Sequence, residues 1–329
     1  MARRRPPHRA RQKQRREIRE NTQALADGER LPGRVISRFG AKLDIEDDRG
    51  EVRRCTSRRR LDDIVCGDRV IWQPLPEENR GVVVERLARD TLLRRPDERG
   101  RIKSVAANID QIIVTSVVKG SRDESYRLNH SLIDHYLVAA ESQGITPVIV
   151  INKIDLLDPS ELEQLKRDMA PYRTIGYNVI HTSTKKAEGL RQLEQQLAHH
   201  TSIFVGESGV GKSSLINALL PGREIRVGAI SAHSGKGKHT TTTTILYHLP
   251  SGGELIDSPG VREFGLVIDT PDAIAHCFIE FRPYLGQCKF NDCSHLHEPG
   301  CAIRAALERG EIDSRRYQSY QRMMADQSH

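Results

Sequence analysis

The feature that most limits the possible folds of this chain is a glycine-rich segment between a strand-like run and a helix-like run. Residues 206–213, GESGVGKS, match the phosphate-binding pattern G-x4-G-K-[ST]. Residues 202–205 predict a buried strand before it, and residues 215–220 predict an apolar helix after it. Glycine permits positive φ and a close approach of the backbone to a polyphosphate, which the helix N-terminus then faces. A nucleoside triphosphate site is therefore expected rather than a chance turn.

The residues of this loop have distinct expected contacts. Lys212 would pair with the β- and γ-phosphates, and the Ser213 hydroxyl would ligate Mg²⁺. We also expect Lys212 to stabilise the charge that develops during phosphoryl transfer, which makes it a catalytic residue. The other loop residues expected to touch the nucleotide are Gly206, Glu207, Ser208, Gly209, Val210, Gly211 and Ser214.

Length and composition exclude several classes of protein. A chain of 329 residues predicts about two or three domains. It has no run of 18 apolar residues, so no transmembrane helix is expected. The first residues lack the apolar stretch of a secretory signal. Six cysteines in a chain of this length do not indicate a disulfide scaffold, so we expect a reducing, cytoplasmic location.

The excess positive charge lies at the N-terminus. Residues 1–20 contain nine Arg or Lys and two Glu, a net +7 that equals the net charge of the whole chain. We expect residues 1–30 to form a basic disordered arm that binds a polyanion and releases counterions. A solvated tail without function is the alternative, whereas Pro6 and Pro7 argue against a mitochondrial presequence.

Residues 31–95 are expected to form a small β-barrel. Short β-like runs separated by turn residues lie at residues 34–37, 41–45, 51–55, 68–72 and 81–85. Five strands in about 60 residues suit an OB-type barrel, a common oligonucleotide-binding fold. Five arginines within residues 53–60 favour nucleic-acid binding, but nearby acidic residues leave a plain docking module as the alternative.

From residue 109 onward, strand-like and helix-like segments alternate. Strands are expected at residues 109–115, 147–151 and 179–181, and helices at residues 131–143, from residue 158, and at residues 190–197. Asp158, Pro159 and Glu161 have the N-cap, N1 and N3 signature of a helix start. The alternation predicts a mostly parallel sheet with helices on both faces, which we expect over residues 96–270.

Two short segments at strand ends are expected to recognise guanine. Residues 152–155, NKID, have the form N-K-x-D and follow the second of these strands, at the edge where ligands bind in such sheets. The Asp155 carboxylate would accept hydrogen bonds from N1–H and the exocyclic amine of guanine, which adenine does not offer. Residues 182–190 resemble the base-closing loop of GTPases. The base-contacting residues expected here are Asn152, Lys153, Ile154, Asp155, Ser183 and Thr184.

A D-x-x-G motif and a threonine run complete the expected site. Asp257 ends a short strand and would hold Mg²⁺ through water, and the Gly260 N–H would sense the γ-phosphate. Five consecutive threonines lie upstream at residues 240–244, of which we expect Thr241 to complete the Mg²⁺ shell. These β-branched residues also suit the start of the following strand.

A cluster of cysteines and histidines near the C-terminus predicts a metal site. Cys288, Cys293 and Cys301 offer three thiolates, and either His295 or His297 offers an imidazole. Four such ligands with no open position suit structural tetrahedral zinc. We expect this zinc to replace a core that so short a segment cannot build. Unpaired reduced cysteines are the alternative.

The order of the nucleotide motifs is unusual and suggests a family. In Ras-type GTPases the P-loop precedes N-K-x-D, whereas here residues 152–155 precede residues 206–213, so a circularly permuted domain is expected. Over residues 31–329 the chain resembles the circularly permuted GTPases, specifically the RsgA (YjeQ) family of small-ribosomal-subunit maturation factors. The resemblance rests on the permuted motifs, the barrel, GKHTTT at residues 237–242, DSPGVREF at residues 257–264 and the cysteine cluster. The family's spacing favours His295 as the fourth zinc ligand.

The expected reaction is in-line attack of water on the γ-phosphate of GTP. Val261 stands where Ras-like enzymes have a water-orienting Gln, so slow intrinsic turnover is expected. By the family resemblance His239 is a catalytic candidate for this role; the alternative is a loop histidine that only packs or contacts RNA. Gly209 stands where some permuted relatives have a potassium-binding Asn, which leaves potassium dependence without that support.

The expected architecture is multidomain: an N-terminal OB-type barrel, a central circularly permuted α/β P-loop GTPase domain, and a C-terminal zinc-binding helical domain at residues 271–329. The resemblance implies a monomeric GTPase of late 30S maturation that is stimulated by the 30S subunit and 16S rRNA and has no membrane partner. A γ-phosphate-dependent shift would change the angle between barrel and zinc module. A nucleotide-gated binding protein is the rival class. The tail residues suited to RNA, or to an ordinary solvated helix, are Arg315, Arg316, Tyr317, Tyr320 and Arg322.

Overall fold

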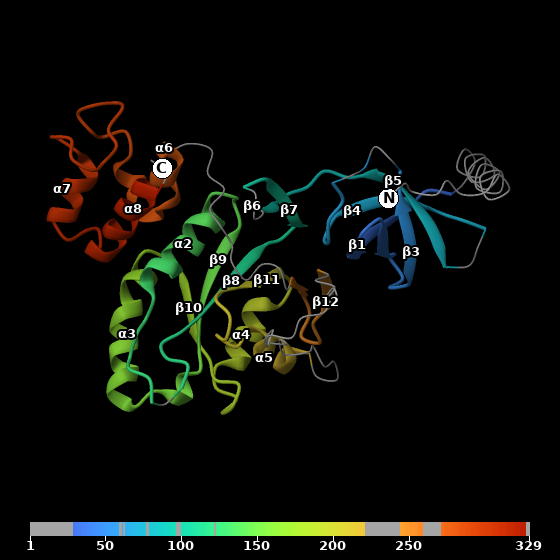
Figure 1. Ribbon diagram of the computed structural model, residues 1–329, viewed down its shortest axis with the longest axis horizontal. Coiled ribbons are helices and arrows are strands. Elements are labelled where there is room, and N and C mark those ends of the chain that lie inside the picture. Colours follow the sequence, from blue (N-terminus) through green and yellow to red (C-terminus); the bar gives the residue numbers. More distant parts are fainter. Residues whose placement is uncertain are drawn as a thin grey trace, which may run out of the picture. The chain divides into compact units, whose positions relative to one another are not determined.

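The computed structural model describes residues 29–58, 61, 63–76, 79–96, 100–121, 123–220, 244–258 and 271–326, without the side chains of residues 271 and 272. The basic arm up to residue 28 lies outside these residues, as do His239, Thr241, Gly260 and Val261. The chain divides into two compact units, Met1–Arg89 and Asp90–His329, coloured along the sequence in Figure 1. None of the helices in the described ranges has the length and apolar character needed to span a membrane.

The first unit is a closed five-stranded barrel, as expected. Its strands are β1 (Leu31–Phe39), β2 (Lys42–Glu46), β3 (Val52–Ser57), β4 (Arg69–Pro74) and β5 (Arg80–Arg86). They are hydrogen-bonded in the order β1-β2-β3-β5-β4, and β4 pairs back onto β1. The pair of β3 and β5 is parallel and the other pairs are antiparallel, which gives an OB-type barrel. The inward side chains that form its core are Val35, Leu43, Ile45, Cys55, Ile64, Val70, Trp72 and Val83.

A two-stranded hairpin opens the second unit. It consists of β6 (Leu92–Pro96) and β7 (Ile102–Ala107), which pair antiparallel. These strands were not predicted from the sequence, because Arg, Lys and Ser interrupt the apolar pattern of the segment. The expected domain boundary at residues 95–96 lies within this hairpin, whereas the two compact units divide between Arg89 and Asp90.

The second unit also contains a mostly parallel sheet of six strands. They are β8 (Gln111–Val117), β9 (Thr146–Asn152), β10 (Asn178–His181), β11 (Thr201–Val205), β12 (Ile245–His248) and β13 (Glu254–Asp257). Their spatial order is β10-β9-β8-β11-β13-β12, and β12 runs antiparallel to β13. The P-loop strand β11 is fourth along the chain, yet it lies between β8 and β13. The parallel strands therefore bring their carboxyl ends, which carry the nucleotide motifs, to one edge.

Helices cover this sheet on both faces, as the alternation of segments predicted (Figure 1). They are α2 (His130–Glu141), α3 (Pro159–Thr174), α4 (Leu190–Leu197) and α5 (Lys212–Leu219). Leucines of α4 and α5 share one apolar core with the sheet. Helix α2 packs against strands β8 and β9, and helix α3 packs against strand β10.

The C-terminal module, residues 271–326, is helical and has an apolar core that Val138 of α2 also joins. It contains α6 (Pro271–Cys277), η2 (Ile279–Tyr284), α7 (Ala302–Glu308) and α8 (Ser314–Asp326). The rings of Phe278, Phe281, Tyr317 and Tyr320 pack with centroids 5.0 to 6.4 Å apart. The aromatic residues supply a core to the module, whereas the expectation of a metal in place of a core concerned only the short ligand segment, residues 288–301, and stays a prediction.

The tail helix α8 also differs from its expected role. Arg316, Tyr317 and Tyr320 are buried, with 1%, 5% and 1% of their surface exposed. The prediction that they bind RNA or lie on a solvated helix is wrong, because they face the module's interior. Arg322 is exposed and Arg315 is half-buried.

Candidate active site and metal centre

The P-loop has backbone conformations that glycine adopts far more readily than other residues. The φ angles of Gly206, Gly209 and Gly211 are 141°, 85° and 95°. A Cβ at Gly206 would lie 2.1 Å from the Thr115 carbonyl oxygen, and one at Gly211 would lie 2.3 Å from Asn152 Nδ2. The loop is thus packed directly against the ends of β8 and β9.

Lys212 begins α5 and folds back over the loop. Its ammonium group donates hydrogen bonds to the carbonyl oxygens of Gly206, at 2.6 Å, and Glu207, at 2.7 Å. Phosphate oxygens would be stronger acceptors, because they carry charge. Ser213 and Ser214 lie half-buried in the first turn of the same helix. The side chains of Glu207 and Ser208 are exposed on the loop, whereas Val210 is buried beneath it.

Asn152 connects the three motifs that lie at this edge of the sheet. It is the last residue of β9 and is 2% exposed. Its Nδ2 donates to the Val210 carbonyl in the P-loop at 2.9 Å, and its Oδ1 accepts from Thr182 Oγ1 at 3.1 Å. The N-K-x-D segment and the P-loop, 58 residues apart in the chain, are therefore in direct contact.

Asp155 is held by the base-closing segment. Ser183 Oγ donates to Asp155 Oδ1 at 2.6 Å, and the Ile154 N–H donates to the Thr182 carbonyl at 3.2 Å. Lys153 has a φ of 62°, which turns the chain into the short helix η1 (Ile154–Leu156). Thr184 follows Ser183 in a turn that the Ser183–Glu188 bridge closes. One Asp155 oxygen is thus fixed by a hydroxyl group, which sets the orientation of the carboxylate.

Asp257 lies at the same edge of the sheet. It ends β13, whose Ile256 is in register with Ile203 of the P-loop strand β11. The next residue, Ser258, shares a hydrogen bond of 3.0 Å with Thr244 Oγ1. The remaining expected contacts, Gly260, Thr241 and His239, lie outside the described residues.

The C-terminal module brings three cysteines and one histidine together. The ligand atoms of Cys288, Cys293, His295 and Cys301 all lie within 4.8 Å of one another. His295 Nδ1 is 3.5 Å from both the Cys288 and Cys301 sulfurs, and these sulfurs are 4.0 Å apart. A tetrahedral zinc with usual bond lengths requires about 3.5 Å between N and S and about 3.8 Å between sulfurs. The donors fit such an ion, and the competing His297 is exposed.

Residues outside the four donors hold the metal-site loop in place. The Glu298 carboxylate accepts hydrogen bonds from the N–H groups of Ser294, Leu296 and His297 and from Ser294 Oγ. From α8, the Tyr317 hydroxyl donates to the His295 carbonyl and the Tyr320 hydroxyl to the Ser294 carbonyl, both at 2.7 Å. The role of Glu298 was missed from the sequence, because only its place next to a Pro-Gly turn marked it. The two tyrosines were expected to contact RNA or to lie on a solvated helix instead.

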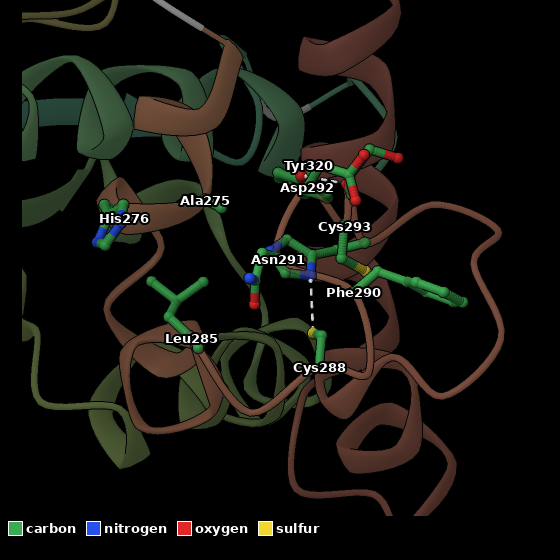
Figure 2. Close-up of a pocket in the computed structure, with 12 residues that line it drawn as sticks. Ala275, His276, Leu285, Cys288, Phe290, Asn291, Asp292, Cys293 and Tyr320 are labelled. Carbon is green, nitrogen blue, oxygen red and sulfur yellow. Dashed lines mark hydrogen bonds between the residues drawn. The ribbon is translucent and has the colours of Figure 1, made fainter.

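A pocket of about 470 Å³ lies beside the cluster. Figure 2 shows Cys288, Cys293 and Asn291 on one side of it and His276 and Leu285 on the other. The exposed Phe290 has the Lys289 ammonium 5.4 Å from its ring centroid. The residues that line the pocket are both polar, such as Asn291 and Asp292, and apolar, such as Leu285 and Phe290.

The chain is similar in sequence to one family of known proteins. A family model described as RsgA GTPase matches residues 86–267, more than half of the chain. The chain belongs to the RsgA GTPase family. "Small ribosomal subunit biogenesis GTPase RsgA" of Chromohalobacter salexigens is 52% identical over 90% of this chain and 86% of its own length. The protein of the same name from Vibrio cholerae is 50% identical over 90% of this chain and 77% of its own length.

Solved RsgA-like structures have the same architecture. YjeQ from Thermotoga maritima is 34% identical, with a TM-score of 0.75, over 91% of this chain and 98% of the other. YloQ, described as a circularly permuted GTPase, is 26% identical with a TM-score of 0.71 over 91% and 95%. The permuted fold expected from the motif order is thus confirmed. As an RsgA GTPase, the chain is a GTP-hydrolysing enzyme.

Proposed function

We propose that this RsgA-family GTPase acts in late maturation of the small ribosomal subunit and hydrolyses GTP faster on the 30S subunit or its 16S rRNA. The names of the curated relatives support the ribosomal role. The enzymatic part of the proposal rests on the two hydrogen bonds of Asn152, one to the P-loop and one to the base-closing segment. A guanine base and its triphosphate would thus bind across one continuous site. We place the protein in the cytoplasm as a monomer, with the GDP form leaving the subunit.

The nucleotide contacts follow from this geometry. Asp155 would accept from N1–H and the amine of guanine, Lys153 would lie along the base, and Ser183 would fix the Asp155 carboxylate. Lys212 would leave its carbonyl partners for the phosphates and stabilise charge that develops on them. The other residues that we assign to the nucleotide are Asn152, Ile154, Thr184, Gly206, Glu207, Ser208, Gly209, Val210, Gly211, Ser213, Ser214, Asp257 and Gly260.

The metal ligands are assigned by donor chemistry. Mg²⁺, when bound, would neutralise charge between the β- and γ-phosphates, and Ser213, Thr241 and Asp257 are the residues that would hold it. Three cysteines and His295 would hold one structural Zn²⁺ per chain, because thiolate and imidazole donors at tetrahedral spacing suit that ion. Their ligand set leaves no position open for a reacting water.

The water-orienting group is proposed to be His239, with acceleration by the ribosomal partner. Val261 offers no hydrogen bond at the position next to Gly260. The protein alone would therefore turn over slowly, and contact with RNA would order the residues that position water.

The test is GTP turnover of the full chain with no addition and with 30S subunits, 50S subunits or free RNA. We expect 30S to raise the rate about tenfold or more, and the Ser213→Ala variant to lose that stimulated rate. Ser251→Ala, at an exposed turn, is the matched control and should behave as the wild type.

Three results would contradict the proposal in different ways. Tight 30S binding without any acceleration would instead indicate a nucleotide-gated binding protein in which hydrolysis is incidental. Equal stimulation by 50S subunits or by free RNA other than 16S rRNA would argue against small-subunit specificity. An association that does not weaken with salt would argue against phosphate contacts by the basic arm.

A further inference from the structure

Lys119 is a buried lysine that belongs to none of the nucleotide motifs. It lies two residues beyond the end of β8, and its side chain is 7% exposed. Its ammonium group lies 2.7 Å from Oε1 and 2.8 Å from Oε2 of Glu161. Burying an ammonium group without a partner costs much free energy, so the folded chain needs Glu161 to keep Lys119 in this position.

Glu161 links Lys119 to the start of helix α3. Glu161 accepts a hydrogen bond from the Asp158 N–H, and Asp158 Oδ1 accepts one from the Glu161 N–H, each at 2.9 Å. This reciprocal pair is a capping box, and the two Lys119 contacts add a charged partner to it. The Lys119 hydrogen bond lowers the pKa of the Glu161 carboxyl group, which shows that the pair favours the ionised carboxylate.

The capping box stands at the far end of the guanine-reading segment. Asp158 is three residues beyond Asp155, and the chain between them is the end of η1. Asn152 fixes the beginning of this segment to the P-loop, and Thr182 and Ser183 fix its middle. The Lys119–Glu161 pair fixes its end to β8, the strand next to the P-loop strand.

We infer that Lys119 and Glu161 are positioning residues for base recognition: they set the orientation of the Asp155 carboxylate and so the preference for guanine. This inference rests on the proposed role of Asp155 in the nucleotide site. Asp155 has to meet two donors of guanine at once, so a small rotation of its carboxylate weakens the paired contact. A nucleotide that offers a single donor is less sensitive to the same rotation.

Inosine triphosphate (ITP) provides that comparison, because its base keeps N1–H and lacks the exocyclic amine. Dissociation constants for GTP and ITP would be measured for the wild type, Lys119→Met and Glu161→Gln. Gln can still accept the capping hydrogen bond but lacks the charge that pairs with Lys119. We expect both variants to weaken GTP binding about tenfold and ITP binding much less, with kcat at saturating GTP unchanged.

Lys166→Met is the matched control on the same helix. Lys166 pairs with Glu163, but these side chains are 52% and 60% exposed, so its loss should leave the GTP-to-ITP ratio at the wild-type value. Thermal unfolding of each variant, followed by circular dichroism, checks that the chain is folded at the assay temperature.

The outcomes separate this inference from the proposed site. A wild type that prefers GTP to ITP, with the preference retained in Lys119→Met and Glu161→Gln, would overturn the positioning role alone. An equal loss of affinity for both nucleotides would also overturn it, because that result indicates general destabilisation. A wild type that binds GTP and ITP equally would overturn the guanine-reading role of Asp155 and this inference with it.

Discussion

At the residue scale, Gly206 and Gly209 differ in what surrounds them although both have positive φ. A Cβ at Gly206 would meet the Thr115 carbonyl oxygen at 2.1 Å, whereas nothing lies within 4 Å of one at Gly209. Gly206 therefore allows the ends of β8 and β11 to approach closely. Gly209 is needed only for the backbone conformation of the loop. The two positions allow packing and backbone conformation to be tested separately.

We predict that Gly206→Ala destabilises the chain by about 2 kcal/mol or more, because it adds a clash to the backbone strain. Gly209→Ala should cost about 1 kcal/mol, from the strain alone. Urea unfolding measures both values, and binding of a fluorescent GDP analogue reports the loop geometry. Equal losses for the two variants would contradict the role assigned to the Thr115 carbonyl.

The roles of single site residues could be predicted from the sequence where a short motif is typical of one kind of binding site. Residues 152–155 and 206–213 have motif spacing, and the structure brings them into contact through Asn152. Lys119 was not predictable as a supporting residue, because its partner Glu161 is 42 residues away. Pairing between distant charges leaves no periodic trace in a sequence.

At the element scale, helix α8 acts as a support for the metal-site loop. Its two tyrosine hydroxyl groups donate to the backbone carbonyls of His295 and Ser294. Their rings meanwhile pack against Phe281. The helix thus fixes the carbonyl groups on both sides of a ligand-bearing peptide, which keeps the His295 imidazole aimed at the cysteines.

We predict that Tyr317→Phe lowers the affinity of the module for zinc about tenfold, because groups that orient metal ligands typically matter to this extent. It should also cost about 1 kcal/mol of stability through the lost hydrogen bond. Tyr284→Phe is the control, since that hydroxyl donates to Glu311 in an exposed pair. Competition with a zinc-binding dye measures the affinity; an unchanged value for Tyr317→Phe would remove α8 from the metal site.

Elements with strong local signals were predicted well. The helix start at Asp158, Pro159 and Glu161 is confirmed as a capping box with Pro at N1 or N2. The barrel strands and the parallel sheet were found because their apolar alternation and turn residues are local. Hairpin β6–β7 and the buried face of α8 were missed, because arginines and tyrosines there are charged or amphipathic in sequence yet packed in the fold.

At the scale of the second unit, a buried ion network fastens the C-terminal module to the GTPase domain. Arg316 Nη1 donates to Asp134 of α2 at 2.8 Å and its Nε to Glu280 of η2 at 2.7 Å. Burial alone would lower the pKa of Arg316, but these two carboxylates raise it well above its usual value. Rotating the module away from α2 would expose or separate these charges, which disfavours movement of the module relative to the GTPase domain.

We predict that Arg316→Met destabilises the second unit by about 3 to 5 kcal/mol, because two buried carboxylates lose their partner. Arg309→Met is the control: Arg309 pairs with Glu311 at the surface and its loss should cost under about 1 kcal/mol. Urea unfolding monitored by circular dichroism measures the difference. A small effect of Arg316→Met would show that the module is only loosely attached and free to rock.

The strand order has a consequence for how the chain folds as it is synthesised. Among the strands of the parallel sheet, β8, β9 and β10 leave the exit tunnel before the others and can pair among themselves, but the inner edge of β8 must wait for β11. All β8 residues except the last are buried in the finished sheet, so until β11 arrives this unpaired strand edge is exposed and prone to wrong pairing. Because the order of the segments is permuted, this edge of β8 stays unpaired while roughly 85 further residues are translated, from the end of β8 to the start of β11. We expect slowed synthesis over that interval to favour aggregation.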